Sequence, residues 1–397
     1  MSNDVGKPPE PLMGDATRMI RAGHLDAPLF KTVGPPIQRG STVLFKDAAQ
    51  LYDHSLTTYG REGLTSQNAL KAALCELEGA VGCQLFPSGV ASVTGPLLAV
   101  LKSGDRLLVS DCAYNPTRRF CDHVLKRFGV DVAYFPPRAS PEEIMSLGGP
   151  NLAAILIESP GSLTFEITDV PAVAALARAR GVITLVDNTW AAGLLFKPLA
   201  HGADISIQAL TKYVGGHSDV FMGSACAGTA AMQQKLDEAV MDVGWSVSPD
   251  DAYQMLRGLR TLPTRLARHG ESGLVVASWL NEQPQVADVL HPAMPDSADY
   301  ALWKRDYTGA CGLFGVVLKP APQTAVNAFL DSLSLFGLGF SWGGFESLAI
   351  PSDSQLPKRY HHAPLAGPLV RIHIGLEDKA DLIADLKQGF AAFDAAR

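Results

Sequence analysis

Short apolar runs of strand length alternate with helical stretches between about residues 65 and 255, and this alternation constrains the fold more than any other feature of the chain. In one of the helical stretches, Pro171 stands in the first turn and Gly181 follows the last. Apolar strands that alternate with helices predict an α/β domain whose mostly parallel sheet is covered by helices on both faces. The runs lie at residues 83–87, 106–110, 131–135, 152–157, 181–186 and 204–207.

The rest of the chain divides around this region. Residues 1–62 are rich in Pro, Gly and Thr and have no strong periodicity, which predicts an extended arm with one short helix near residues 16–22. We expect the large α/β domain to occupy residues 63–257 and a smaller α/β domain to occupy residues 258–397. The smaller domain should contain a long helix around 262–280, short strands at 312–318 and 369–374, and a final amphipathic helix at 378–393.

Composition excludes several classes of protein. With 47% apolar residues among 397, the chain can bury a large core and is not disordered. A net charge of −7 without a Lys/Arg block argues against nucleic acid or an anionic membrane as the main partner. The first 14 residues lack the apolar segment of a signal peptide, and the six cysteines form no CxxC pair or metal-type cluster. We therefore expect a cytoplasmic protein with reduced thiols, no membrane segment and no metal.

Two strand ends carry side chains that suggest chemistry. One apolar run delivers Asp187 and the next delivers Lys212, 25 residues later. Either residue alone is more often a turn former or a solvated lysine. Together they suggest a site for pyridoxal 5'-phosphate, because that cofactor needs a lysine amine for its covalent link and a carboxylate facing its pyridine nitrogen. Ser88, Gly89 and Val90 stand where a strand passes into a helix, a place suited to a phosphate, although small residues before a helix are also common in ordinary turns.

Longer segments extend this argument to a family. The chain resembles the Cys/Met-metabolism enzymes that use pyridoxal phosphate, from about residue 17 to the C-terminus. That resemblance implies the fold-type I architecture of pyridoxal-phosphate-dependent transferases: a mostly parallel seven-stranded sheet with helices on both faces, an N-terminal arm and a smaller C-terminal α/β domain. Segments 158–162, 190–193 and 371–378 resemble the branch that performs β-elimination. The family motifs are Tyr59-Gly-Arg61, Pro87-Ser-Gly89, Val186-Asp187-Asn-Thr-Trp190, and the segments at 209–219 and 341–347.

The resemblance implies roles for the cofactor-binding residues. Lys212 would hold the cofactor and, once freed by the substrate amine, would move the Cα proton. Asp187 would pair with the pyridine nitrogen, and Tyr114 would stack on the ring; a buried core tyrosine is the alternative for Tyr114. The phosphate would be bound by the backbone amides of Gly89 and Val90 and by the hydroxyl of Thr211.

Further residues are implied in binding the substrate and a neighbouring subunit. Arg371 would bind the substrate α-carboxylate in a bidentate pair, unless it forms a structural ion pair. Ser341 and Trp342 would line the substrate pocket. Tyr59 and Arg61 would reach the phosphate of a neighbouring subunit, unless they belong to an ordinary exposed turn. This last role implies a homo-oligomer, and the family implies a homotetramer built from dimers.

The implied reaction is β-elimination from L-cystathionine, which yields homocysteine, pyruvate and ammonia in methionine biosynthesis. The alternatives are a γ-acting relative (a γ-lyase or γ-synthase), a broad cysteine-S-conjugate β-lyase or desulfhydrase, and a non-catalytic homologue. Trp342 favours the β route if it narrows the pocket, but not if it serves only core packing. Pro116 stands where methionine γ-lyases carry cysteine. Ala209 and Ser162 replace the serine and asparagine of many family members, a departure that fits the β-elimination branch.

Overall fold

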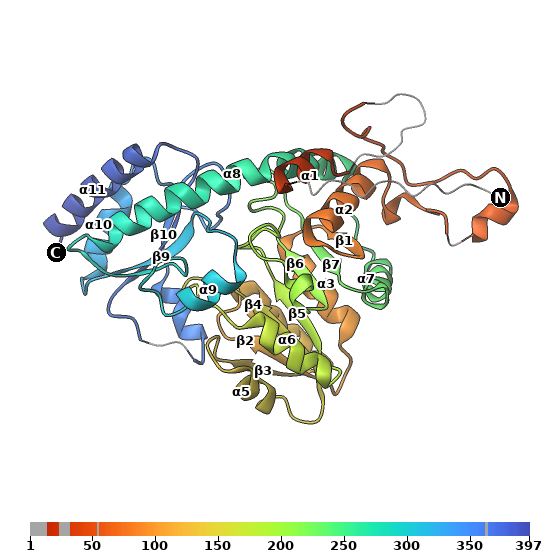
Figure 1. The fold of residues 1–397 in the computed structure, drawn as a ribbon, viewed down its shortest axis with the longest axis horizontal. Helices are drawn as coiled ribbons and strands as arrows, with labels where there is room; N and C mark the ends of the chain where they lie inside the picture. The colour runs from red at the N-terminus through yellow and green to blue at the C-terminus, as the bar shows by residue number, and fades with distance from the viewer. Residues whose placement is uncertain (1–13, 24–31, 54, 362–363) are drawn as a thin grey trace.

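The large domain is built on a seven-stranded sheet. The computed structural model describes residues 14–23, 32–53, 55–361 and 364–397. The strands of this sheet lie in the order β1-β7-β6-β5-β4-β2-β3 (Figure 1). Their bounds are β1 Gly82–Phe86, β2 Arg106–Ser110, β3 Asp131–Phe135, β4 Leu152–Glu158, β5 Ile183–Asp187, β6 Ile205–Gln208 and β7 Gly223–Ala227.

The strand pairing is mostly parallel, as expected. Strands β3, β2, β4, β5 and β6 pair in parallel, and β7 pairs antiparallel with both β6 and β1. The apolar runs located six of the seven strands. The seventh strand, β7, was not predicted, because its sequence Gly-Ser-Ala-Cys-Ala lacks the branched and aromatic residues that mark a strand.

Helices cover both faces of this sheet, as the alternation of strands and helices in the sequence predicted. Successive strand residues point to opposite faces. Leu108 accordingly packs in one buried cluster with residues of α2, α6 and α8, and its neighbour Leu107 packs in another with residues of α3 and α7. The helices around the large sheet are α2 Thr65–Glu78, α3 Gly89–Val100, α4 Asn115–Phe120, α5 Pro141–Ser146, α6 Val170–Ala179, α7 Ala230–Val243 and α8 Pro249–Asn281.

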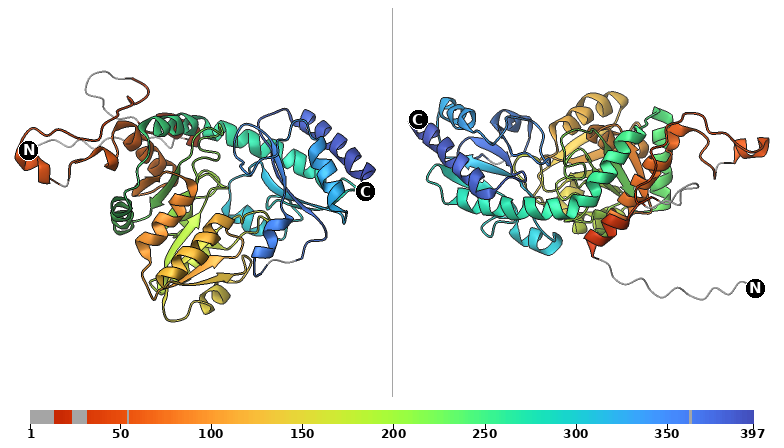
Figure 2. Two further views of the ribbon diagram at one scale, coloured as in Figure 1. Left: turned by 180° about the vertical axis from the view of Figure 1, so that it is seen from behind. Right: turned by 90° about the horizontal axis from the view of Figure 1, so that it is seen from above.

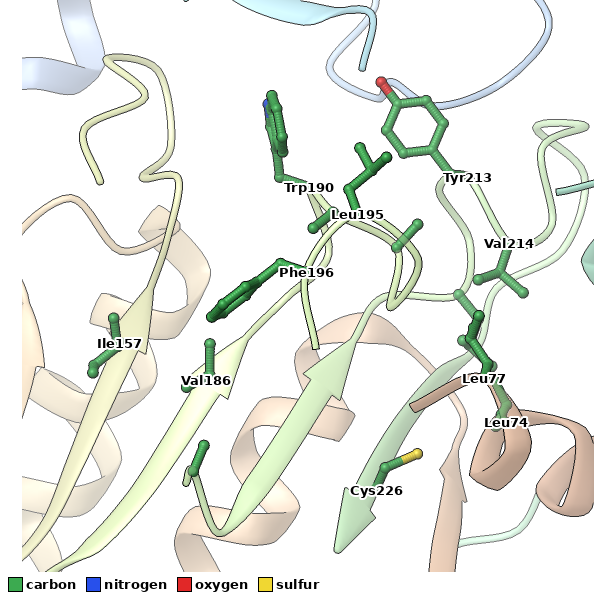
Figure 3. Close-up of a cluster of buried hydrophobic side chains, with 14 of the residues drawn as sticks. Leu74, Leu77, Ile157, Val186, Trp190, Leu195, Phe196, Tyr213, Val214 and Cys226 are labelled. Atoms are coloured by element: carbon green, nitrogen blue, oxygen red, sulfur yellow. The ribbon is translucent and has the colours of Figure 1, made fainter. Parts of the chain in front are cut away.

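The first of these clusters forms the core beneath the sheet. Figure 3 shows Ile157 and Val186 on the neighbouring strands β4 and β5, with Leu74 and Leu77 projecting from α2. All four side chains are at most 1% exposed. Burial of a side chain of this size contributes about 1.5–3 kcal/mol, so this packing fixes the strands whose ends carry the candidate site.

The smaller domain is a four-stranded antiparallel sheet in the order β10-β11-β9-β8. The expected strands at 312–318 and 369–374 are β9 and β11. The last helix begins and ends within two residues of the prediction. The elements are α9 Tyr300–Asp306, α10 Gln323–Ser332, α11 Lys379–Ala395, β8 Val286–Leu290, β9 Leu313–Leu318, β10 Leu348–Pro351 and β11 Leu369–His373.

Helix α8 joins the two sheets. It begins at Pro249, where the Ser248 hydroxyl accepts backbone N–H groups of the first turn, and it runs for 33 residues beside both domains (Figures 1 and 2). The boundary proposed at residues 257/258 therefore falls inside a continuous helix, and it stays a prediction. Within the described ranges, no helix combines the length and the apolar character needed to cross a membrane.

The N-terminal region contains the expected short helix, α1 Asp15–Arg21, which packs on α2 and α8. Residues 32–62 form two short 3-10 helices, at 48–52 and 60–62, and no long element. Figures 1 and 2 show this segment reaching away from the body of the chain. Its shape is that of an arm. Residues 1–13, 24–31 and 54 lie outside the described part of the chain.

Arg265 of α8 fixes the backbone that follows Lys212. The residue is 8% exposed, and its guanidinium donates to the carbonyl oxygens of Tyr213 at 2.7 Å, Val214 at 3.1 Å and Gly258 at 2.7 Å. Among the residues that the structure describes, no carboxylate pairs with this arginine, and burial lowers the pKa of Arg265 to about 10. Backbone carbonyls thus satisfy a buried cation directly behind the candidate site.

We predict that Arg265→Ala strongly destabilises the chain. Removal of the guanidinium takes the hydrogen-bond donor from the buried carbonyls of Tyr213 and Val214, and each loss costs about 1–3 kcal/mol, whereas Gly258 O keeps the Thr261 hydroxyl. The free energy of unfolding, measured by denaturant titration, should fall by about 3 kcal/mol or more. Arg268→Ala on the same helix is the matched control, because Arg268 pairs at the surface with Asp378, and its effect should stay within about 0.5 kcal/mol. Equal effects of the two substitutions would contradict this prediction.

Candidate active site

The carboxyl ends of β4, β5 and β6 bring three ionisable side chains to one edge of the large sheet. Glu158 is the last residue of β4 and pairs in register with Asp187, the last residue of β5. Asp187 pairs in turn with Ile207 of β6, and Lys212 follows four residues after β6 ends. Because these strands are parallel, their ends meet at the edge where ligands bind in open α/β sheets.

A cavity of about 400 Å³ opens at this edge. Its lining includes nine of the eleven site residues predicted from the sequence, drawn from both domains. Tyr59 and Arg61 are the two that do not line it. The nine are Gly89, Val90, Tyr114, Asp187, Thr211, Lys212, Ser341, Trp342 and Arg371.

The Lys212 amine lies at the centre of this arrangement. Nζ donates a hydrogen bond to Ser341 Oγ at 2.9 Å and lies 5.3 Å from the centroid of the Trp342 ring. Burial and the nearby Arg371 charge lower the pKa of Lys212 to about 8, while Asp187 acts in the opposite direction. The amine can therefore lose its proton near neutral pH, as a catalytic base must.

Two carboxyl groups, those of Asp187 and Glu158, line the cavity. Thr189 donates to Asp187 Oδ1 through its backbone N–H at 3.1 Å and its hydroxyl at 2.5 Å. Burial raises the pKa of Asp187. Burial, followed by the Asp187 charge, raises the pKa of Glu158 to about 8. A cationic partner facing Asp187, such as a protonated pyridine nitrogen, would favour its ionised form.

The start of α3 fits a phosphate group. Gly89 and Val90 precede the first helical hydrogen bond, from Ser92 N–H to Ser88 O, so their amides are among those that a helix leaves unpaired. A Cβ at Gly89 would lie 2.4 Å from Ala209 Cβ, so the backbone needs glycine here. Ala209, one departure from the family pattern, is thus the residue that packs against this turn. Backbone donors at a helix N-terminus suit an anion.

The hydroxyl of Thr211 is engaged within the chain. It donates to Met222 O at 3.2 Å and accepts the Met222 N–H at 3.0 Å. A hydroxyl has a single proton to donate, so donation to a phosphate would require this proton to turn from Met222 toward the cavity. The phosphate role of Thr211 stays a prediction.

Arg371, on β11, reaches the cavity from the smaller domain. It is 8% exposed, and burial lowers its pKa to about 10, so it remains cationic at neutral pH. Its Nη2 donates to Ser341 O at 2.9 Å, and no carboxylate is among its hydrogen-bond partners in the described part of the chain. The structural ion pair considered as an alternative is therefore not present among these residues, and the guanidinium can bind an anion.

Tyr114 also lines the cavity and is 46% exposed, so it is not a buried core tyrosine. Its backbone N–H donates to Glu158 Oε2 at 2.6 Å. Ser162 donates its hydroxyl to the other oxygen of the same carboxylate at 2.5 Å. Ser162, the second departure from the family pattern, therefore supports Glu158, which in turn fixes Tyr114.

Tyr59 and Arg61 lie in the arm, away from this cavity. Tyr59 is 47% exposed, and Arg61 donates to Met241 O at 3.0 Å. They contribute nothing to the site of their own chain. Their role at a neighbouring subunit stays a prediction.

Three residues that shape the site had no role assigned from the sequence. Glu158 ends its strand with an acid just as Asp187 does, and this shared position could have identified it. Thr189 and His373 give no comparable signal, because each acts through a hydrogen bond that depends on the folded backbone.

Comparison with known proteins agrees with this geometry. The profile of the Cys/Met metabolism PLP-dependent enzymes matches residues 16–391. Cystathionine β-lyases of Escherichia coli and Salmonella typhimurium are 43% and 42% identical, each over 94% of this chain and 98% of the relative. Among solved structures, a cystathionine γ-synthase from Xanthomonas oryzae pv. oryzae in complex with cystathionine has a TM-score of 0.90 at 32% identity, covering 97% of this chain and all of that one.

We predict that Lys212 loses its proton near pH 8 in protein freed of cofactor. Trace acetylation across a pH series, read by mass spectrometry of the Lys212 peptide, should give a midpoint at about 8. Lys126 serves as the internal reference, since its hydrogen bond to Asp122 raises its pKa. Arg371→Met should move the Lys212 midpoint upward, because it removes a nearby positive charge. A Lys212 midpoint at or above that of Lys126 would count against this electrostatic account.

Proposed function

The chain belongs to the Cys/Met metabolism PLP-dependent enzyme family, and from this premise we propose that it is a carbon–sulfur lyase that cleaves L-cystathionine by β-elimination. One water is consumed when the enamine left by elimination hydrolyses, and the products are homocysteine, pyruvate and ammonia. One observation carries the proposal: the Lys212 amine, the Asp187 carboxyl and the Arg371 guanidinium line the same cavity. Named cystathionine β-lyases at 42–43% identity over nearly the full chain support it.

The cavity fits pyridoxal phosphate. The amides of Gly89 and Val90 would bind its phosphate, Asp187 would face its pyridine nitrogen, and Tyr114 would stack on its ring. Lys212 would form the covalent link. When bound, the cofactor supplies an electron sink for the negative charge that develops at the substrate Cα.

Lys212 carries the proton transfers. Its pKa near 8 leaves a substantial neutral fraction of the amine, which takes the proton from the substrate Cα. The Cβ–S bond then breaks and its electron pair leaves with the sulfur. The Lys212 ammonium returns a proton to that sulfur, which departs as a thiol. Positioned acid–base groups of this kind typically accelerate a reaction about 10²–10⁴-fold.

Arg371 orients the substrate for this transfer. Its guanidinium presents a planar set of donors that matches a carboxylate in a bidentate pair. Burial of the guanidinium strengthens that pair, because water competes less for both partners. Binding the α-carboxylate at Arg371, close to Lys212, would hold the Cα proton near the base.

Trp342 supports the β route over the γ route. It lines the cavity beside Ser341 and is only partly buried, so it does not serve core packing alone. A bulky ring here narrows the space that a longer γ-elimination intermediate would need. The similarity to a solved cystathionine γ-synthase is among the observations that support the γ-acting alternative. A non-catalytic homologue would not need Lys212, Asp187, Tyr114 and Arg371 together.

We predict that purified protein incubated with L-cystathionine forms pyruvate and homocysteine. Lys212→Ala should lower the rate by several orders of magnitude, because one group serves both proton transfers. Keto acids identified by chromatography and thiols identified after derivatisation provide the measurement. Predominant 2-oxobutyrate with cysteine would replace the β-lyase assignment with a γ-lyase. Turnover of cysteine or its S-conjugates at higher kcat/KM would indicate a broad desulfhydrase.

We propose that the active assembly is a homo-oligomer, a tetramer of two dimers. Tyr59 and Arg61 belong to the N-terminal segment and do not line the cavity of their own chain, and this placement supports contact with a neighbour's phosphate. Symmetric closure is the usual route to such assemblies. The cytoplasm is the expected location, since none of the six cysteines forms a disulfide.

We predict that Arg61→Ala weakens cofactor retention without unfolding the chain. Loss of the guanidinium removes a charge-assisted contact to the neighbour's phosphate. Dialysis followed by measurement of bound cofactor should show a several-fold faster loss than in the original protein. Arg127→Ala, at an exposed arginine outside the arm, is the control and should retain cofactor normally. A fully active monomer in sedimentation experiments would contradict the role of Arg61 at a neighbouring site.

A further inference from the structure

Two side chains of β11 hold one segment of the active site. Arg371 and His373 are two residues apart on this strand and therefore project from the same face. Opposite them lies the segment at residues 339–344, which contains Ser341 and Trp342 and is called here the Ser341 segment. Arg371 Nη2 donates to Ser341 O at 2.9 Å, and the Gly343 N–H donates to His373 Nε2 at 3.0 Å. These two bonds lie on either side of Trp342.

The bond from Gly343 determines which nitrogen of His373 carries the proton. An amide N–H can only donate, so Nε2 must be unprotonated and the proton must lie on Nδ1. The Gly344 carbonyl lies 3.2 Å from the same nitrogen and would favour the opposite tautomer. That tautomer would leave the buried Gly343 N–H unpaired, and an unpaired buried N–H is rarer than an under-satisfied carbonyl. Nδ1–H is therefore the favoured state.

His269 of α8 complements this tautomer. Its Nδ1 lies 2.8 Å from Ile374 O, which only accepts, so the His269 Nε2 carries a lone pair. His269 Nε2 and His373 Nδ1 are both buried and have no hydrogen-bond partner within the described ranges. One is thus an acceptor and the other a donor, on rings whose centroids lie 5.3 Å apart. No direct hydrogen bond joins these two nitrogens, but one bridging water would satisfy both.

The Ser341 segment packs directly on the catalytic lysine. A Cβ at Gly343 would lie 3.0 Å from Lys212 Cα, so the two backbones are in close contact. Within this segment, Ser341 Oγ accepts a hydrogen bond from the Lys212 amine, and the Trp342 ring faces the same amine. A displacement of Gly343 would therefore change the surroundings of the amine.

We propose that His373, supported by His269, is a positioning residue. By accepting a hydrogen bond from the Gly343 N–H, it holds Ser341 and Trp342 in place around the Lys212 amine. The effect on turnover rests on the proposed lyase function. The hydrogen bond between Gly343 and His373 does not rest on that function, so the positioning role and the lyase function can be disproved independently.

Hydrogen exchange tests the bond in the holoenzyme. His373→Leu removes the acceptor, whereas His373→Gln keeps an acceptor at about the position of Nε2. Exchange in the peptide covering residues 339–347 should become about tenfold faster or more in His373→Leu. His373→Gln should stay close to the original protein, and β9 peptides should be unchanged in both. Ile372→Val is the matched control, since it removes one buried methylene from the opposite face of β11.

Steady-state kinetics with L-cystathionine test the consequence. Misplacement of Ser341 and Trp342 should lower kcat by about 10²-fold in His373→Leu, because errors of about 1 Å in a catalytic group have effects of this size. KM should change little, since Arg371 still binds the carboxylate. His373→Gln should restore kcat to within a few-fold.

Two results would overturn the proposal. One is a His373→Leu protein in which both exchange and kcat match the original. The other is faster exchange in the β9 peptides as well, with no rescue by His373→Gln, which would reduce His373 to a structural role. If His373→Leu does not fold, a measurement on the original protein can still test the hydrogen bond from Gly343. In ¹⁵N-histidine spectra, with His373→Gln used for assignment, a neutral His373 must carry its proton on Nδ1. A proton on Nε2 would exclude the bond from Gly343.

Discussion

Parallel pairing of β4, β5 and β6 is the constraint on which the site depends. It places the carboxyl ends of three strands side by side, and so brings together Glu158, Asp187 and the backbone that leads to Lys212. Side chains alternate between the faces of a sheet, so a slip of one residue in this register would present Val186 where Asp187 now lies. The apolar packing of the strands therefore fixes the chemistry at their ends, although no core residue takes part in it.

The same burial that stabilises the sheet sets the charges of the site. Removal from water disfavours every charged form here, which lowers the pKa of Lys212 and raises that of Asp187. These two shifts oppose the mutual attraction of the pair, and for Lys212 burial is the larger effect. The result is an amine that can release its proton near neutral pH beside a carboxyl that needs a cationic partner. A protonated pyridine ring is such a partner.

The sequence predicted those features that depend on short segments. Strand–helix alternation predicted the mostly parallel sheet, and Asp187 and Lys212, 25 residues apart at two strand ends, predicted the cofactor. Strand β7 escaped because its small residues carry no strand signal, and pairing with both neighbours stabilises it instead. His373 escaped because its contact with Gly343 spans 30 residues of chain. Contacts of this kind form only when distant segments of the smaller domain have packed, so local patterns cannot reveal them.

Helix α8 explains how two domains form one cavity. Arg265 binds the backbone that follows Lys212, and His269, four residues later, binds the carbonyl of Ile374 at the end of β11. Residues four apart lie on the same face of a helix, separated by about 6 Å along its axis. This single helical turn thus contacts both the segment that carries the base and the strand that carries Arg371. The distance between base and carboxylate-binding group is therefore set by a rigid helix that crosses both domains, and does not depend on a flexible linker between them.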